Sequence, residues 1–236
     1  MTTIVSTAAY AAAKALAPAG HIPKRSHLSE VMAAMLGYQT YAALVVEERD
    51  ASLPHHLGDA ELLVLNPPAG ELRARKLGVG DVSSVIQACI VALKASVGDI
   101  QVYRGLDDFY DSYGRDALAE AVSSSEEVAS AMAETNAYFG DDPELPDETP
   151  PTENLWEARA GWSIEARGKM HGEHDADGDR MFAGDTLNCY GKLSFVKAGR
   201  AGLISADSEG YAGVDDSIRN QDHDDEAAYM ESLRHP

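Results

Sequence analysis

The densest group of side chains that could do chemistry lies between residues 171 and 179. Imidazole and carboxylate groups stand there among small residues, and they belong to His171, His174, Asp175, Asp177 and Asp179. Because imidazole nitrogens and carboxylate oxygens are ligands for divalent metal ions, this run predicts a weak divalent-cation site. One hypothesis for the function is therefore a metal-dependent hydrolase or lyase that uses these five residues.

The same run does not follow the spacing of a calcium-binding loop. If Asp175 takes the first position, Arg180 stands at the sixth, where such a loop needs glycine. If Glu173 takes the first position, Gly178 fits, but Gly184 replaces the bidentate glutamate of the twelfth. A solvated polar turn between two strands explains the same composition. We predict no cofactor beyond a weakly held cation.

A second candidate is the pair of basic residues at the end of a predicted strand, Lys197 and Arg200. Two cations three residues apart could hold an anion, although a strand end at the solvent explains them equally. No sequence pattern of a nucleophile elbow or a phosphate-binding loop occurs in the chain. We therefore predict no catalytic residue, and a non-enzymatic function is favoured.

The composition excludes several classes of protein. The chain has 236 residues and a net charge of −20, which opposes binding to nucleic acid or to anionic membranes. No apolar run approaches the ~18 residues that a membrane span needs, and the N-terminus lacks a basic segment of the kind that begins a secretory signal. Cys89 and Cys189 are expected to be buried free thiols. Together these features predict a soluble cytoplasmic protein.

The charge is distributed unevenly along the chain. Residues 1–49 hold four basic and three acidic side chains, a net charge of +1, so the remainder carries −21. Such asymmetry suggests that the two parts have different surface functions.

The N-terminal segment has the periodicity of a compact helical module. A helix is expected over residues 6–16, and a second one has apolar residues at helical spacing, namely Leu28, Val31, Met32, Met35 and Leu36. Ser26 is its expected N-cap and Gly37 its stop, after which Tyr38 packs back on the helix. Thr40 is expected to cap a third helix over residues 41–48.

Further along the chain, short strands and helices give way to long alternating strands. Asp81 and the capping-box pair Ser124 and Glu127 each predict the start of a helix, and strands are expected over residues 61–65 and 100–103. Residues 162–170 and 187–195 alternate between apolar and polar, which is typical of two antiparallel strands with one buried face.

We therefore predict an α+β fold, in which an N-terminal helical module is followed by helices packed on a small, mostly antiparallel sheet. Five segments are expected: a helical module (1–50), a mainly helical region with a short strand (51–140), an acidic, proline-rich linker or loop (141–153), an antiparallel β-rich region (154–214) and an acidic tail (215–236).

The helical module also carries the residues that we predict to form a docking surface. They are two cations and two tyrosines, Lys24, Arg25, Tyr38 and Tyr41. Because the module is close to neutral on an otherwise acidic chain, its surface suits contact with a protein partner or with a second copy of the chain. Structural packing within the module explains the same residues without a partner.

Residues 26–44 of this module resemble a small helical module of bacterial glyoxalase-related proteins. The resemblance rests on Ser26-His27, on the glycine stop Gly37, and on the following Tyr38, Tyr41 and Leu44. It implies an accessory bacterial protein, with a setting in antiphage defence or plasmid biology. The metal-binding pattern of glyoxalases is not recognisable in the chain, so the resemblance assigns no catalytic residue. The leading hypothesis is a non-enzymatic binding or adaptor protein that acts through protein–protein contacts.

Overall fold

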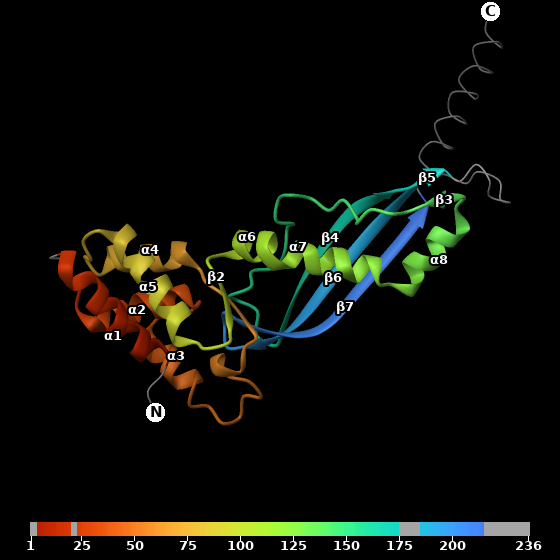
Figure 1. Cartoon of the computed structure of the whole chain (residues 1–236). Coiled ribbons are helices and arrows are strands. Elements are labelled where there is room, and N and C mark those ends of the chain that lie inside the picture. The colour runs from red at the N-terminus through yellow and green to blue at the C-terminus, as the bar shows by residue number, and fades with distance from the viewer. Residues whose placement is uncertain (1–3, 20–22, 175–184, 215–236) are drawn as a thin grey trace, which may run out of the picture. The chain divides into compact units, whose positions relative to one another are not determined.

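The structure is a computed structural model, and it describes residues 4–19, 23–174 and 185–214. It confirms the predicted α+β class, since helices accompany a five-stranded sheet and a two-stranded sheet (Figure 1). The predicted metal ligands Asp175, Asp177 and Asp179, and the predicted acidic tail over residues 215–236, lie outside the described residues.

The chain divides into two compact units, each assembled from separate stretches of sequence. Unit 1 comprises residues 1–114, 148–164 and 193–207, and unit 2 comprises residues 115–147, 165–192 and 208–236. Three long strands contribute one part to each unit, so the boundaries of the units do not follow the five segments expected along the chain.

Unit 1 contains the N-terminal helices and the larger hydrophobic core. Its main helices are α1 (Ile4–Leu16), α2 (Arg25–Met35), α3 (Tyr41–Glu47), α4 (Pro67–Lys76) and α5 (Val82–Ser96). The apolar stripe predicted on the second helix is confirmed, because Leu28, Val31, Met32 and Met35 are all fully buried. Neither α1 nor α2 could bury its stripe alone, and the two helices pack on each other and on α5.

The ends of these helices confirm some of the predicted caps and correct others. Gly37 ends α2 with a positive φ of 85°, and Thr40 and Asp81 cap α3 and α5 through their side-chain oxygens. Ser26 is not the N-cap of α2, because the helix already begins at Arg25 and Lys24 takes the cap position. Ser124 does not cap α8 (Glu126–Glu134) either, since Ser125 holds that position.

Helix α4 is an element that the sequence pattern does not predict. Pro67 and Pro68 occupy its first turn, where a missing N–H leaves no hydrogen bond unmade, and Asn66 accepts a hydrogen bond from the Ala69 N–H at its start. Only Gly70 and Ala74 of the helix are buried, so it has no wide apolar stripe that could reveal it.

The five-stranded sheet has the order β2-β1-β7-β6-β4. Its strands are β1 (Leu62–Val64), β2 (Gln101–Tyr103), β4 (Gly161–His171), β6 (Thr186–Ala198) and β7 (Gly202–Val214). β1 pairs in parallel with β2 and antiparallel with β7. β4 and β6 are antiparallel, because Gly172 and Lys197 donate backbone hydrogen bonds to Asp185 and Ala160, respectively. The alternation predicted for both long strands is confirmed by their burial patterns.

An aromatic cluster joins β4 and β6 to the helical segment that follows β2 in unit 1. Phe109 lies at its centre, in α6 (Leu106–Phe109), and its ring contacts those of Trp162 and Phe195 at centroid distances of 5.9 and 6.0 Å. A short π-helix, Tyr110–Gly114, follows α6 directly.

Unit 2 contains α7 (Arg115–Ser123), α8 and a small sheet of β3 (Ala137–Tyr138) and β5 (Glu173–His174). It also contains the parts of the three long strands that lie within residues 165–192 and from residue 208 onward. Its core consists of Val122, Val128, Ala131, Met170, Leu187 and Cys189. Helix α7 lies against β7 so closely that a Cβ atom at Gly210 would sit 2.2 Å from the Ala121 carbonyl oxygen. Only glycine therefore fits at this point of the strand.

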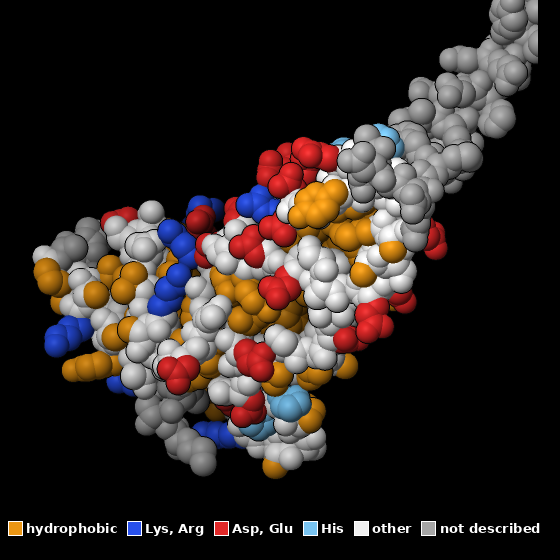
Figure 2. All heavy atoms as spheres, turned by 45° about the vertical axis from the view of Figure 1, so that its right-hand side comes forward, with side chains coloured by type: hydrophobic (Ala, Val, Ile, Leu, Met, Phe, Trp, Pro, Cys, Tyr) orange, Lys and Arg blue, Asp and Glu red, His pale blue; other side chains and the backbone are white. Residues whose placement is uncertain are grey.

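The predictions for the cysteines and for a membrane span can also be compared with the structure. Cys89 and Cys189 are free and buried, as expected. No helix among the described residues is both long and apolar enough to cross a membrane. Figure 2 shows Asp and Glu side chains scattered over one face of the molecule, between uncharged and hydrophobic side chains.

Candidate functional site

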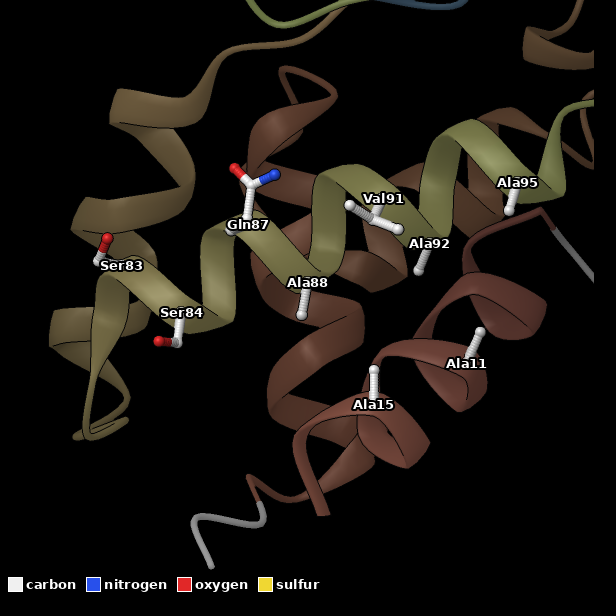
Figure 3. Close-up of a pocket in the computed structure, with 9 residues that line it drawn as sticks. All are labelled: Ala11, Ala15, Ser83, Ser84, Gln87, Ala88, Val91, Ala92 and Ala95. Atoms are coloured by element: carbon white, nitrogen blue, oxygen red, sulfur yellow. The ribbon is translucent and has the colours of Figure 1, made fainter. Parts of the chain in front are cut away.

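A groove runs between α1 and α5 on the surface of unit 1. Its volume is about 570 Å³. It is lined by Ala11, Ala15, Ser83, Ser84, Gln87, Ala88, Val91, Ala92 and Ala95. Figure 3 shows the methyl groups of Ala11 and Ala15 on α1 facing the side of α5 that carries Ala88 and Ala92.

The small side chains of this groove explain why it is open. Helix α1 buries Ala8, Ala9, Ala12 and Leu16 on one face, and its Ala11 and Ala15 stay exposed beside that face. Since alanine has only a methyl group, the space above the contact between α1 and α5 stays unfilled. On α5 the side chain of Val91 is 57% exposed, which is high for an aliphatic residue in a groove.

The chemistry of the lining is that of a contact surface. None of its nine residues carries a titratable side chain, so the groove has no group for acid–base catalysis, nucleophilic attack or metal binding. The amide of Gln87 and the hydroxyl groups of Ser83 and Ser84, at one end of the groove, offer a few hydrogen bonds. An exposed apolar hollow of this kind is typical of a site for another macromolecule.

The four residues predicted to form the docking surface are not brought together as one exposed patch. Lys24 and Arg25 are exposed at the start of α2, where Arg25 donates a hydrogen bond to the Ser6 hydroxyl at 3.1 Å. Tyr41 is half-buried at the start of α3. Tyr38 is only 2% exposed, so its ring belongs to the core, as expected for an aromatic residue after the glycine stop.

Tyr38 instead anchors a polar network within unit 1. Its hydroxyl donates to Glu47 Oε1 at 2.6 Å and accepts from the backbone N–H of Arg200 at 3.2 Å. The Arg200 guanidinium lies 5.3 Å from the centre of the Tyr38 ring, and its Nε is 3.9 Å from Glu47 Oε2. Burial and the hydrogen bond to Glu47 raise the pKa of Tyr38 far above its usual value, so the phenol keeps its proton.

Lys197 lies beside this network, buried inside unit 1 with 4% of its surface exposed. Its ammonium group donates to the carbonyl oxygens of Leu155 and Arg200 at 3.1 and 2.7 Å. It therefore cannot reach an anion in the solvent, whereas Arg200 is partly exposed. The alternation of β6 contains the signal for this burial, because Lys197 continues the inward series of Leu193 and Phe195.

The described part of the predicted metal site contains His171, the C-terminal residue of β4, and His174 in β5. Both are exposed. His171 Nε2 lies 3.7 Å from Glu144, and His174 Nδ1 lies 3.1 Å from the Asn136 carbonyl oxygen. Among the described residues no three His, Cys, Asp or Glu side chains gather closely enough to hold a metal ion. The metal site therefore stays a prediction that depends on residues 175–179.

Comparison with known proteins gives no match to a family model, a curated protein or a solved structure. The resemblance of residues 26–44 to the module of glyoxalase-related proteins likewise stays a prediction.

Proposed function

We propose that the protein is a non-enzymatic binding protein that holds an α-helix of a partner protein in the groove between α1 and α5. The observation that supports this proposal is the uncharged lining of the groove on a chain with a net charge of −20. A surface without charge can be dehydrated at little cost, because no ionic group loses its hydration shell.

The dimensions and side chains of the groove suit a helix. Residues 83–95 of α5 extend over roughly 18 Å at 1.5 Å per residue, which corresponds to about three turns of a partner helix. Alanine and serine residues let two helix backbones approach closely, as in other contacts between helices with small residues. Amphipathic helices are a common occupant of such apolar grooves.

The charges beside the groove indicate the chemistry of the partner. Lys14 and Lys94 are exposed on α1 and α5, and neither helix contains an acidic residue, while Asp81 at the cap of α5 accepts a hydrogen bond from the Ser84 N–H. We therefore expect a partner helix with a narrow apolar face and acidic flanks. A second copy of the chain would place lysines opposite lysines, so a different protein is the better occupant. The resemblance of residues 26–44 suggests a bacterial accessory system, such as antiphage defence, as its setting.

Site-specific photocrosslinking in cells that contain the partner tests this proposal. A photoreactive residue is placed at Val91 in the groove or, as the control, at Val46 on α3, which is 71% exposed. We expect the full-length chain to crosslink from position 91, and not from position 46, to one protein through an acidic amphipathic helix. Crosslinks to a second copy alone, or none, would contradict the proposed partner.

Two matched substitutions measure the contribution of the groove to binding. Val91→Glu puts a carboxylate against the apolar face and acidic flanks of the helix, so we expect the partner to bind at least tenfold more weakly, a loss of about 1.4 kcal/mol or more. Val46→Glu adds the same charge outside the groove and should change the affinity less than twofold. Equal effects of the two substitutions would mean that the partner binds elsewhere.

A further inference from the structure

A second groove in unit 1 has the opposite chemistry to the first. Its volume is about 790 Å³, within the range of roughly 300–1,000 Å³ typical of small-molecule sites. Its walls come from the end of α2 and the following turn, from the start and one face of α4, from the loop that carries Trp156, and from Arg200 between β6 and β7. It shares no lining residue with the groove between α1 and α5.

Three cationic side chains line this groove on a strongly acidic protein. Arg73 and Lys76 lie three residues apart on α4, and Arg200 reaches the groove from the turn between β6 and β7. Glu30 binds one amino group of Arg73. Arg200 has Glu47 Oε2 at 3.9 Å from its Nε, and one of its amino groups donates a hydrogen bond of 3.3 Å to the Gly37 carbonyl oxygen. In the described part of the chain, the second amino group of each arginine and the Lys76 ammonium make no hydrogen bond or ion pair.

The neutral side chains of the groove add donors and few acceptors. Asn66 Oδ1 and Asn154 Oδ1 each accept a backbone N–H, from Ala69 and Trp156, so both amides have their NH₂ groups left to donate. Thr40 Oγ1 likewise accepts from its own helix. The one carboxylate of the lining is Glu157, which is exposed. A groove rich in unused donors suits a ligand rich in oxygen acceptors.

The walls of the groove are held in place by buried contacts. Lys197 binds the carbonyl oxygens of Leu155 and Arg200, which fixes the backbone next to Trp156 and at Arg200. The Trp156 indole donates to the Val64 carbonyl oxygen at 2.9 Å. Because the Trp156 ring and the backbone at Arg200 are already positioned, a ligand would lose little free energy in ordering these two parts of the groove.

We propose that this groove binds a small organic anion. Arg73, Lys76 and Arg200 would hold its phosphate or carboxylate group, and its uncharged part would contact the ring of Trp156. The alternative, that these are ordinary surface cations, is less consistent with their placement. The neighbouring Arg75 is such a cation, since it lies outside the groove and pairs with Glu71 one helical turn away.

Tryptophan fluorescence gives a direct measurement of binding. The chain has two tryptophans, and Trp162→Phe leaves Trp156 as the only reporter. We expect AMP or citrate to change its emission saturably, and inorganic phosphate, which has no organic part, to bind more weakly than AMP. Titration calorimetry on the unsubstituted chain repeats the measurement without the tryptophan substitution.

Two matched substitutions on α4 test which cations hold the anion. Lys76→Gln removes a groove cation with no partner among the described residues, so the dissociation constant should rise about fivefold or more, equivalent to about 1 kcal/mol. Arg75→Gln removes one positive charge from the adjacent position and should change the constant less than twofold.

Three outcomes would overturn the inference. The first is no saturable signal from any of the three probes up to roughly 10 mM, a concentration that corresponds to a binding free energy of only about −3 kcal/mol. The second is an equal loss of affinity in the two α4 variants. The third is equal affinity for phosphate and AMP, which would remove the role of Trp156. Tighter binding of inorganic phosphate than of citrate would identify phosphate as the anionic group, and tighter binding of citrate than of AMP, which has the larger uncharged part, would identify carboxylate. None of these results depends on whether a helix binds between α1 and α5.

Discussion

The ammonium group of Lys197 connects two stretches of unit 1 that lie far apart in the sequence. It is held by two carbonyl oxygens and has little contact with solvent. Burial lowers the pKa of Lys197 to about 7, although the nearby Glu47 acts in the opposite direction. The amine therefore changes its charge near neutral pH inside the folded protein, whereas in the unfolded chain it stays charged to about pH 10.

This difference predicts a pH-dependent contribution of Lys197 to stability. Below pH 7 both states bind the proton, so the contribution is constant. Above pH 7 the unfolded state alone keeps the proton, so the free energy of unfolding rises with pH, by at most about 1.4 kcal/mol per unit. We expect the free energy of unfolding of the unsubstituted protein to rise relative to that of Lys197→Met between pH 7 and 9, as measured by urea denaturation.

Lys192→Met serves as the control for this measurement, because it removes a lysine from the same strand at a site with a partly exposed side chain. The difference between Lys197→Met and Lys192→Met then removes effects common to any loss of a lysine from β6. A difference that does not change between pH 7 and 9 would show that the buried amine does not lose its proton there.

At the scale of residues, burial was more predictable than polar partners. The periodicity of β6 contains enough information to place Lys197 inside, and the position after a glycine stop predicts a buried Tyr38. The hydrogen bond between Tyr38 and Arg200 could not be predicted, because Arg200 lies in a turn 162 residues away. No local sequence pattern indicates a hydrogen bond between residues that are so far apart in the chain.

Among the elements, the end of α2 combines two separate requirements at one residue. Gly37 has a φ of 85°, and a Cβ atom there would lie 2.9 Å from Trp156 Cβ and 3.2 Å from Arg200 Cβ. The first requirement concerns the backbone. The second concerns the packing of the loop and turn that form the groove lined by Arg73, Lys76 and Arg200, here called the polar groove.

Gly37→Ala should therefore destabilise the protein by more than backbone strain alone. Strain at a positive φ costs about 1 kcal/mol, and overpacking against Trp156 and Arg200 adds about 1–3 kcal/mol. Gly78→Ala is the matched control, because Gly78 also has a positive φ, 65°, but open space around its Cβ. Urea denaturation should show the larger loss for Gly37→Ala, and equal losses would mean that the contacts yield without cost.

The helices differ in how clearly the sequence predicts them. Helices α2 and α5 have apolar residues at helical spacing and clear stops, so their positions follow from the sequence. Helix α4 lacks an apolar stripe, and the proline pair at its start is equally typical of a turn. Because α4 supplies Arg73 and Lys76, the polar groove could not be predicted without the structure.

Over the whole molecule, acidic side chains outnumber basic ones by 39 to 19. Repulsion among scattered carboxylates destabilises the folded state, and added salt shortens its range from about 30 Å at 0.01 M to about 8 Å at 0.15 M.

We expect the melting temperature at pH 7 to rise between these two concentrations of sodium chloride, in a calorimetric scan. The same step near the isoelectric point, about pH 4.6, should have a smaller effect, because the net charge is then close to zero. A melting temperature at pH 7 that falls with salt would show that favourable ion pairs outweigh the repulsion, and one that does not change would show that they balance it.

The fold class and the two long strands were predictable at this scale, because periodicity reports one buried face on each strand. The order of the sheet and the division into two units were not. Each unit combines three separate stretches of chain, and local sequence patterns do not report which distant stretches pair.

The return of residues 193–207 to unit 1 has a consequence for how the protein is made. The helical module is synthesised before this stretch, because Arg200, the partner of Tyr38 and Gly37, lies 162 and 163 residues further along the chain. While the ribosome is still adding those residues, the module lacks Lys197, Arg200 and the strands that cover part of its core. Unit 1 therefore completes its folding only after residues 193–207 have been synthesised, and the helical module is not a separable domain.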